Sequence, residues 1–230
     1  MTRELRDQVE FGRAILQALG TPVEALGILS ADDEIRWDEL PQESVAKPAK
    51  FVAPDDKRTI LRLAIDHLHR QAASPKKVAA MPAGAPFGEI KVDKDACTLC
   101  MSCVSVCPAA AVQAGGDLPQ LKFVEWNCVQ CGLCETACPE DAISLNPRLI
   151  FDAEARQSTR ILHEEQPFCC IVCGKPFATQ SVLDRMVKKL EGHWMFQSEE
   201  AMRRLQMCDT CRVKDMFQAE RNRHDKGPIS

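Results

Sequence analysis

Two runs of cysteines that lie 31 residues apart constrain the fold of this chain more than any other feature. Each run has the spacing C-x2-C-x2-C-x3-C-P, and the runs begin at Cys97 and at Cys128. The flanking segments repeat as well, because residues 90–92 align with 121–123 and residues 111–112 align with 142–143. Each copy predicts a short strand, a cysteine loop, a brief helix and a second short strand. Two such copies should pair their strands across a pseudo-two-fold axis.

Iron–sulfur ligation is the chemistry that this spacing predicts. Both runs resemble those of bacterial ferredoxins, in which three cysteines wrap one cubane and the fourth reaches the neighbouring one. We therefore expect cluster I to be held by Cys97, Cys100, Cys103 and Cys138, and cluster II by Cys128, Cys131, Cys134 and Cys107. The proline after each run is expected to begin a short helix, where its missing N–H is tolerated. Zinc or disulfides are the alternative, and two complete copies are hard to explain that way.

Residues 89–146 as a whole resemble the dicluster 4Fe-4S ferredoxin family, and the match covers about a quarter of the chain. The resemblance implies one-electron transfer at each cluster and no small-molecule substrate. No charged residue lies between Ala96 and Gly116, and Glu135 is the one charge between Cys128 and Cys138. With no cation nearby, reduction of an anionic cluster is disfavoured, so the sequence predicts low potentials.

A second group of cysteines follows the repeat. Cys170 and Cys173 form one C-x2-C pair and Cys208 and Cys211 form another. Four thiolates in two such pairs are typical of a closed structural zinc site, which is the expected occupant. A third iron–sulfur cluster and unmetallated thiols are the alternatives. The neighbouring Cys169 is expected to be a spare thiol, although it could replace a ligand, as could His163 or His193.

The chain is expected to have an α+β fold, with a ferredoxin-like dicluster module of two short β-hairpins and short helices at its centre. We predict a helical N-terminal segment and linker at residues 1–88, the dicluster domain at 89–148, and a helical segment with the four-cysteine site at 149–230. Apolar periodicity predicts helices over residues 3–19, from Asp55 or Asp56 to Ala73, over 178–191, and from Ser198 to Met207. Residues 31–54, 74–88 and 149–166 are expected to be mainly loop, with an edge element in the last.

Composition indicates the cellular compartment and limits the class of partner. Thirteen cysteines in tight clusters, with no secretory signal and no apolar run long enough to span a membrane, indicate a reducing compartment, and we expect a cytoplasmic protein. Residues 1–46 carry four basic and ten acidic residues, whereas residues 47–91 carry nine and four. No segment is both basic and aromatic enough to predict nucleic-acid binding.

The predicted function is that of an electron carrier or electron-transfer subunit with no catalytic residue of its own. The chain has no G-x-G-x-x-G motif after a strand and no P-loop. With its trailing Cys-Gly-Lys-Pro-Phe segment, Cys173 to Phe177, the arrangement is similar to the C-terminal part of larger bacterial cytoplasmic iron–sulfur proteins. That resemblance implies a redox partner such as a formate dehydrogenase. The alternative is an accessory or assembly factor whose clusters are structural or act as a sensor.

Overall fold

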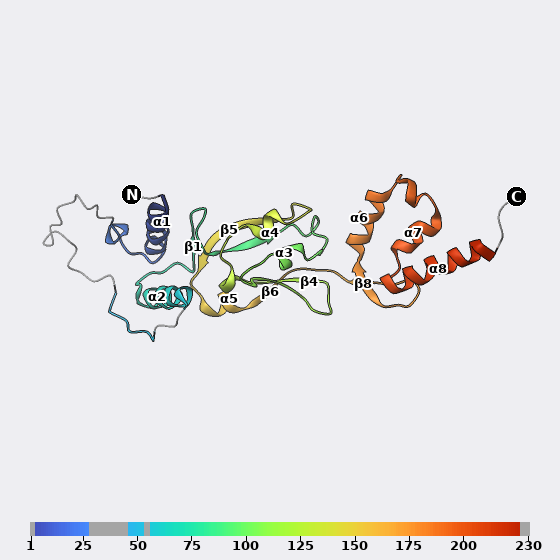
Figure 1. Ribbon diagram of the computed structural model, residues 1–230. Helices are drawn as coiled ribbons and strands as arrows, with labels where there is room; N and C mark the ends of the chain where they lie inside the picture. Colours follow the sequence, from blue (N-terminus) through green and yellow to red (C-terminus); the bar gives the residue numbers. More distant parts are fainter. Residues whose placement is uncertain (1–2, 28–45, 53–55, 226–230) are drawn as a thin grey trace.

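The computed structural model describes residues 3–27, 46–52 and 56–225 of the chain. It is elongated, with two N-terminal helices at one end, small antiparallel sheets in the middle and three further helices at the other end (Figure 1). The α+β class and the order of elements predicted from the sequence are confirmed. None of the described helices is long and apolar enough to cross a membrane.

The central module has the predicted internal repeat. The first copy contains β2 (Gly88–Val92), α3 (Ser102–Ser105) and β3 (Val112–Ala114); the second contains β4 (Gln120–Val124), α4 (Leu133–Thr136) and β5 (Ile143–Ile150). Strand β3 forms a hairpin with β4, and β2 pairs antiparallel with β5. Each strand pair thus joins one copy to the other. Left-handed backbone conformations recur at the same 31-residue offset, at Leu99 and Gln130, Met101 and Gly132, and Ala110 and Asp141.

The two short helices lie earlier in the chain than the sequence predicted, before the proline of each run. Helix α3 ends at Ser105 and α4 ends at Thr136, so each helix contains the third cysteine of its run and stops before the fourth. The expectation that the proline begins the helix was therefore wrong. A residue that precedes proline is disfavoured in the helical region, so Cys107 and Cys138 fall outside the helices.

Each pair of strands carries a third strand. The strand at residues 78–80 was not predicted, whereas the strand at residues 159–164 corresponds to the edge element expected within 149–166. Strand β1 (Val78–Ala80) pairs with β5, and β6 (Thr159–Glu164) pairs with β4. They form sheets of order β1-β5-β2 and β3-β4-β6. Helix α5 (Ala153–Gln157) is capped by Asp152, whose side chain accepts from the Ala155 N–H, and η2 (Glu125–Asn127) follows β4. Parts of the stretches 74–88 and 149–166 that looked like loop are therefore ordered.

The N-terminal helices pack on the sheet that contains β1. Helix α1 (Arg3–Ala18) precedes the short η1 (Val23–Ala25), and α2 (Lys57–Gln71) begins after Asp56, whose carboxylate accepts from the N–H groups of Arg58 and Thr59. Both helices are close to the predicted bounds. Much of the loop predicted at 31–54 lies outside the described residues. The core of this part consists of Ala18, Leu19, Ile65, Ala79, Met81, Ala85, Phe87, Leu149 and Phe151.

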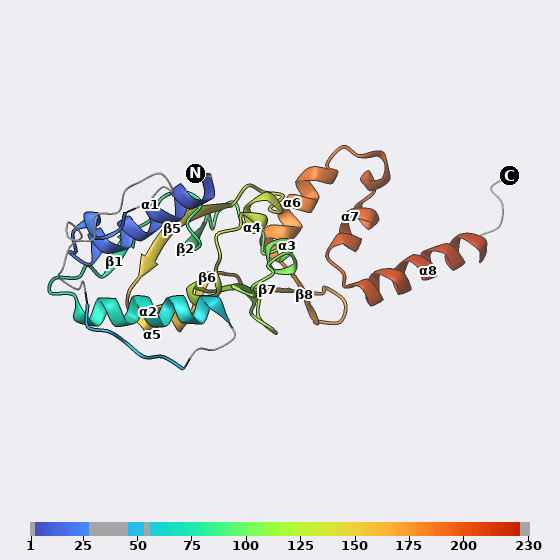
Figure 2. The ribbon, with the colours of Figure 1, turned by 60° about the vertical axis from the view of Figure 1, so that its left-hand side comes forward.

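The C-terminal part begins with a hairpin of β7 (Pro167–Cys169) and β8 (Pro176–Thr179), followed by α6 (Gln180–Leu190), η3 (Trp194–Phe196) and α7 (Glu199–Leu205). Helices α6 and α7 match the prediction. Helix α8 (Asp209–Asp225) was not predicted and extends away from the rest of the molecule (Figure 2). Its sequence is polar on nearly all sides, so it lacks the apolar stripe by which a helix is recognised.

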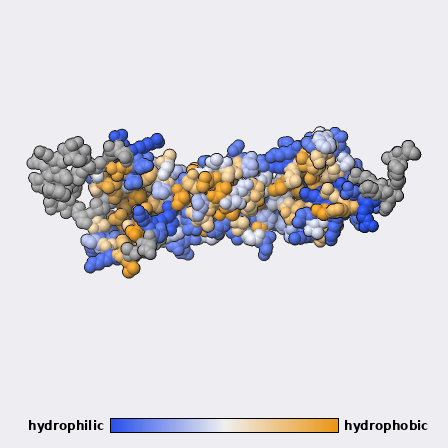
Figure 3. Space-filling model, viewed as in Figure 1, coloured by the Kyte–Doolittle hydropathy of each residue, from blue (hydrophilic) through white to orange (hydrophobic). Residues whose placement is uncertain are grey.

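Buried apolar residues form three separate cores rather than one. The central core surrounds the cysteine runs, the second lies under α1 and α2, and the small third one is made of Cys170, Met207 and Cys208. The visible surface likewise shows apolar side chains over all three parts (Figure 3). Cysteines belong to two of the cores, so bound metal would contribute to packing there.

Replacing Phe123 with alanine is expected to destabilise the central module strongly. Its side chain is fully buried, and truncation of a buried phenylalanine typically costs about 3–5 kcal/mol. Anaerobic denaturant titration, followed through the visible absorbance of the clusters, should show a lower midpoint. Leu118→Ala is the matched control, because Leu118 is 53% exposed and its loss should shift the midpoint little. Equal midpoints for both variants would contradict this assignment of the core.

Candidate functional site

The eight cysteines of the repeat line two separate cavities in the central module. One cavity, here called cavity I, is lined by Cys97, Cys100, Cys103 and Cys138. The other, cavity II, is lined by Cys107, Cys128, Cys131 and Cys134. The lining of each cavity thus combines three cysteines of one run with the fourth cysteine of the other run.

The backbone of each cysteine loop directs N–H groups at sulfur. The N–H of Leu99 bonds to Cys97 in the first run, and the N–H of Gln130 bonds to Cys128 at the equivalent position of the second. Both donors are in the left-handed conformation, which turns the peptide toward the cavity. The N–H of Ala142 also donates to Cys138 Sγ at 3.3 Å. Such donors stabilise thiolates and the sulfurs of a bound cluster.

The buried thiols cannot all ionise by themselves. Desolvation, followed by repulsion from Cys97 and Cys100, raises the pKa of Cys103 to about 12. Desolvation and repulsion from Cys128 likewise raise the pKa of Cys134 to about 11. Because ligation requires thiolates, the four sulfurs of each cavity need positive charge among them, which bound iron supplies. The donor set and the mainly apolar walls therefore fit a 4Fe-4S cluster.

Each cavity approaches the protein surface at the second cysteine of its run. Cys100 and Cys131 are exposed, whereas Cys103, Cys128 and Cys134 are buried. Although desolvation raises it, hydrogen bonds from Ser102 lower the pKa of the Cys100 thiol. An outside partner could thus approach either cavity without the protein opening.

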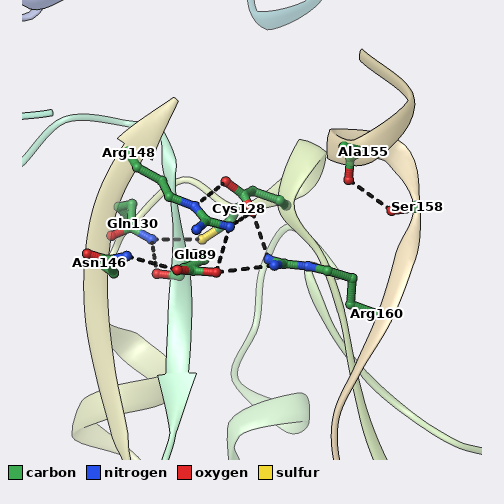
Figure 4. A network of polar contacts seen from close by, with 9 residues as sticks. Glu89, Cys128, Gln130, Asn146, Arg148, Ala155, Ser158 and Arg160 are labelled. Carbon is green, nitrogen blue, oxygen red and sulfur yellow. Dashed lines mark hydrogen bonds and ion pairs between the residues drawn. The ribbon is translucent and has the colours of Figure 1, made fainter. Parts of the chain in front are cut away.

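A network of charged side chains braces the loop of cavity II (Figure 4). Arg148, on β5, forms a bidentate pair with Glu125 at 2.8 and 3.0 Å and also contacts Glu89 at 2.6 Å. Arg160, on β6, pairs with the same two carboxylates at 2.7 and 3.2 Å. The network connects the two three-stranded sheets directly beside Cys128.

The arginines and glutamates of this network stabilise each other's charges in a partly buried environment. Hydrogen bonding to Glu125 raises the pKa of Arg148, and Glu125 is 5% exposed. Arg148→Met should therefore leave a buried carboxylate short of a partner and cost about 3 kcal/mol, seen as a lower denaturation midpoint. Arg13→Met is the control, because the pair of Arg13 with Glu10 is solvent-exposed and contributes less than about 1 kcal/mol. Comparable losses in the two variants would contradict the bracing role.

Two arginines from helices on either side of the repeat each contact one of the cysteine loops. Arg58, on α2, donates to the carbonyl oxygens of Pro86, at 2.9 Å, and Cys128. Arg185, on α6, donates to the Ala96 carbonyl oxygen at 2.7 Å and pairs with Glu140. The expectation that no cation lies near the clusters was thus wrong, because an arginine contacts each cysteine loop. Arg58 lies 70 residues from Cys128, and no local pattern predicts that contact.

The C-terminal cysteines form a third group. Cys170 and Cys173 lie in the turn between β7 and β8, where Gly174 has a positive φ of 73° and its N–H bonds to the Cys170 carbonyl at 2.9 Å. Cys208 and Cys211 lie at the start of α8, and the helix N-terminus favours negative charge there. All four sulfurs lie within 4.8 Å of one another, and those of Cys173 and Cys208 are 3.7 Å apart.

These distances fit a single ion better than a cubane. Zinc–sulfur bonds of about 2.3 Å in a tetrahedron place the sulfurs about 3.8 Å apart. The sulfurs around a cubane lie farther apart, because each bonds a different iron atom. In the described part of the chain, no other group of three or more potential ligands is as close as the C-terminal four.

The thiols of the C-terminal four-cysteine group share their protons through hydrogen bonds. Although desolvation opposes it, N–H bonds from Cys208, Cys173 and Val172 lower the pKa of Cys170 to about 6. Hydrogen bonding to Cys173, followed by burial, raises the pKa of Cys211 to about 12. A metal that binds here displaces the remaining protons.

The other residues considered as ligands lie outside the group. Cys169 is exposed on β7 and pairs with Pro176 in the hairpin. His163 is buried on β6, 3.8 Å from Glu165, and His193 caps η3 through the Met195 N–H. Gln130 is a further site residue that sequence reasoning missed. Its position opposite Leu99 in the repeat was the available signal, since the two copies differ there.

Comparison with known protein families matches residues 89–139 to the 4Fe-4S dicluster domain. No curated protein sequence matches the chain. The matched segment includes all eight cysteines of cavities I and II. The segments on either side of it are not covered by the match. Residues 89–139 of this chain are therefore a 4Fe-4S dicluster domain, which binds two 4Fe-4S clusters.

Proposed function

We propose that this protein transfers single electrons between redox partners through two 4Fe-4S clusters. The observation that carries the proposal is the pair of four-cysteine cavities inside a dicluster domain. When bound, the clusters supply one-electron redox chemistry. All eight thiols are used as ligands, so neither site leaves an iron open for a substrate, and we assign no catalytic residue.

The proposed ligands follow the cavity linings. Cluster I is assigned to Cys97, Cys100, Cys103 and Cys138, and cluster II to Cys107, Cys128, Cys131 and Cys134. The protein holds these thiols by αL turns, aims backbone N–H groups at them and excludes water with apolar walls. Cys100 and Cys131 are the exposed ligands, and we propose that electrons enter and leave on their sides.

The C-terminal group is proposed to hold one structural zinc ion. Its four sulfurs have the spacing of a tetrahedral site. Four thiolate ligands would fill that site and leave no coordination position free for a substrate. The ion would join the β7–β8 turn to the start of α8, where Cys170, Met207 and Cys208 form a small buried cluster. In this role zinc orders the C-terminal helices and takes no part in electron transfer.

A dehydrogenase or reductase in the cytoplasm is the proposed partner class, and a formate dehydrogenase is the candidate that the Cys173–Phe177 segment favours. Oxidation of one formate to carbon dioxide and a proton releases two electrons, which match one electron for each cluster. The anaerobic chain should therefore bleach when mixed with a formate dehydrogenase and formate, and recover on addition of an oxidant. The same mixture without formate is the control. No bleaching by this or any other dehydrogenase or reductase would contradict the proposed function.

An accessory factor for a redox enzyme is the second candidate. The C-terminal part has its own core and exposes large apolar side chains, including Trp194 at 75% and Phe217 at 64%. Such side chains suit a protein-binding surface. This function predicts stable binding to the immature enzyme alone, without reversible bleaching during turnover, whereas the carrier function predicts the opposite.

A further inference from the structure

We infer that the two cluster sites are electrostatically unequal, and that cluster II has the higher reduction potential because of Gln130 and Arg58. The inference rests on the proposed electron-transfer function and on its ligand assignment. It assigns to these two residues a positioning and tuning role toward the Cys128 sulfur. The internal repeat allows Gln130 to be compared with its counterpart Leu99. Arg58 and Arg185 lie outside the repeat and are compared by their contacts with the two cysteine loops.

Gln130 gives cavity II a side-chain donor to sulfur. Its Nε2 donates to Cys128 Sγ at 3.3 Å and to the Glu89 carbonyl oxygen at 3.0 Å. The side chain is 9% exposed, and its Oε1 is buried without a hydrogen-bond partner. Gly88 makes room for it, because a Cβ at that position would lie 2.5 Å from Gln130 Cδ. The amide is therefore confined beside the sulfur.

The counterpart of Gln130 in the first repeat is Leu99. The two backbones match, with φ angles of 54° and 55°, and Leu99 is likewise buried on the wall of its cavity. A leucine side chain offers no hydrogen to Cys97 Sγ. Cavity I thus has the same loop geometry as cavity II but lacks this N–H···S bond.

The charged residues near the two cavities also differ in a way that favours a higher reduction potential at cluster II. Glu140 lines cavity I, whereas its counterpart Ala109 lines cavity II. The arginine near cavity I, Arg185, is paired with that glutamate. Within the described part of the chain, no carboxylate forms an ion pair with the Arg58 guanidinium, which bonds the carbonyl of the cluster II ligand Cys128 and lies 5.2 Å over the Phe87 ring.

These differences change the reduction potentials of the clusters, because reduction adds one negative charge to a cluster that is already anionic. A hydrogen-bond donor at sulfur and an unpaired cation nearby both stabilise the reduced form more than the oxidised form. Both features are present at cluster II. Cluster I has Leu99 at the position of Gln130, and the arginine near it, Arg185, is paired with Glu140. The first electron supplied by a reductant such as dithionite should therefore reside on cluster II.

Exchange of the two counterparts tests the ordering. Anaerobic redox titrations followed by EPR would be performed on the full-length wild type, Gln130→Leu and Leu99→Gln. We expect two midpoint potentials in the wild type. Gln130→Leu should lower the higher one and leave the lower one nearly unchanged, and Leu99→Gln should raise the lower one. Arg58→Gln should also lower the higher potential, whereas Arg185→Gln should not.

The outcomes separate this inference from the function on which it rests. Mere loosening of a loop would reduce cluster occupancy, and it would not raise a potential as Leu99→Gln is expected to do. Two clusters whose potentials do not respond to the exchange, or a Gln130→Leu shift confined to the lower potential, would overturn the ordering alone. A wild type without two 4Fe-4S signals would overturn the proposed function together with it.

Discussion

Cys138→Ala is expected to destroy the cluster whose other three ligands lie in the first repeat. Cys138 lines the same cavity as Cys97, Cys100 and Cys103, although its own run lies in the second repeat. Loss of one of four ligands at a buried site should reduce iron from about eight to about four atoms per chain. Iron analysis of the anaerobically purified variant measures this loss.

The identity of the lost cluster can be read from thiol protection. After alkylation of the native variant and peptide mapping, Cys97, Cys100 and Cys103 should be modified, and the cysteines of cavity II should stay protected. Cys107→Ala is the reciprocal variant and should expose the three remaining cysteines of cavity II. Alkylation of Cys128, Cys131 and Cys134 in the Cys138→Ala chain would contradict the exchange of ligands between repeats.

Removal of the ion from the C-terminal group is expected to unfold the helices that follow it. The buried core cluster at this group consists of Cys170, Met207 and Cys208, and structural zinc typically contributes about 10–16 kcal/mol to the folding of small zinc domains. Cys208→Ala should therefore lose about one zinc per chain. It should also lose helical circular dichroism and become sensitive to protease between residues 170 and 225. Its iron content should not change.

Cys169→Ala is the matched control for this variant. Cys169 adjoins Cys170 in sequence, but it is exposed on β7 and lies outside the group of four sulfurs. Its replacement should leave zinc content, helicity and protease resistance as in the wild type. Equal zinc loss in both variants would show that Cys169 is a ligand, and an intact helical signal in Cys208→Ala would remove the structural role of the ion.

Local spacing explains why so much of the central module could be predicted. The cysteine positions and the strand pairing between repeats both follow from one motif present twice. The helices at 3–19 and 178–191 were predictable because their apolar residues recur at helical spacing. Helix α7 was predicted from Ser198 in the same way, and the structure shows the Ser198 side chain capping it by accepting from the Ala201 N–H.

Contacts that are distant in sequence explain the rest. Strand β1 is three residues long and contains only Val78, Ala79 and Ala80, so its pairing with β5 leaves no periodic signal. The bond from Arg58 to Cys128 depends on where α2 docks, and docking is set by tertiary packing. Helix α8 lacks a stripe of buried apolar residues, so its own sequence pattern does not predict a helix. Its helical start is tied to the Cys208–Cys211 pair instead.

Metal analysis of the anaerobically purified wild-type chain tests the central claim most directly. The account predicts about eight iron atoms and about one zinc ion per chain, together with the EPR spectrum of two interacting 4Fe-4S clusters on reduction. A folded chain that is colourless and free of iron, or one that carries a single mononuclear metal, would contradict it.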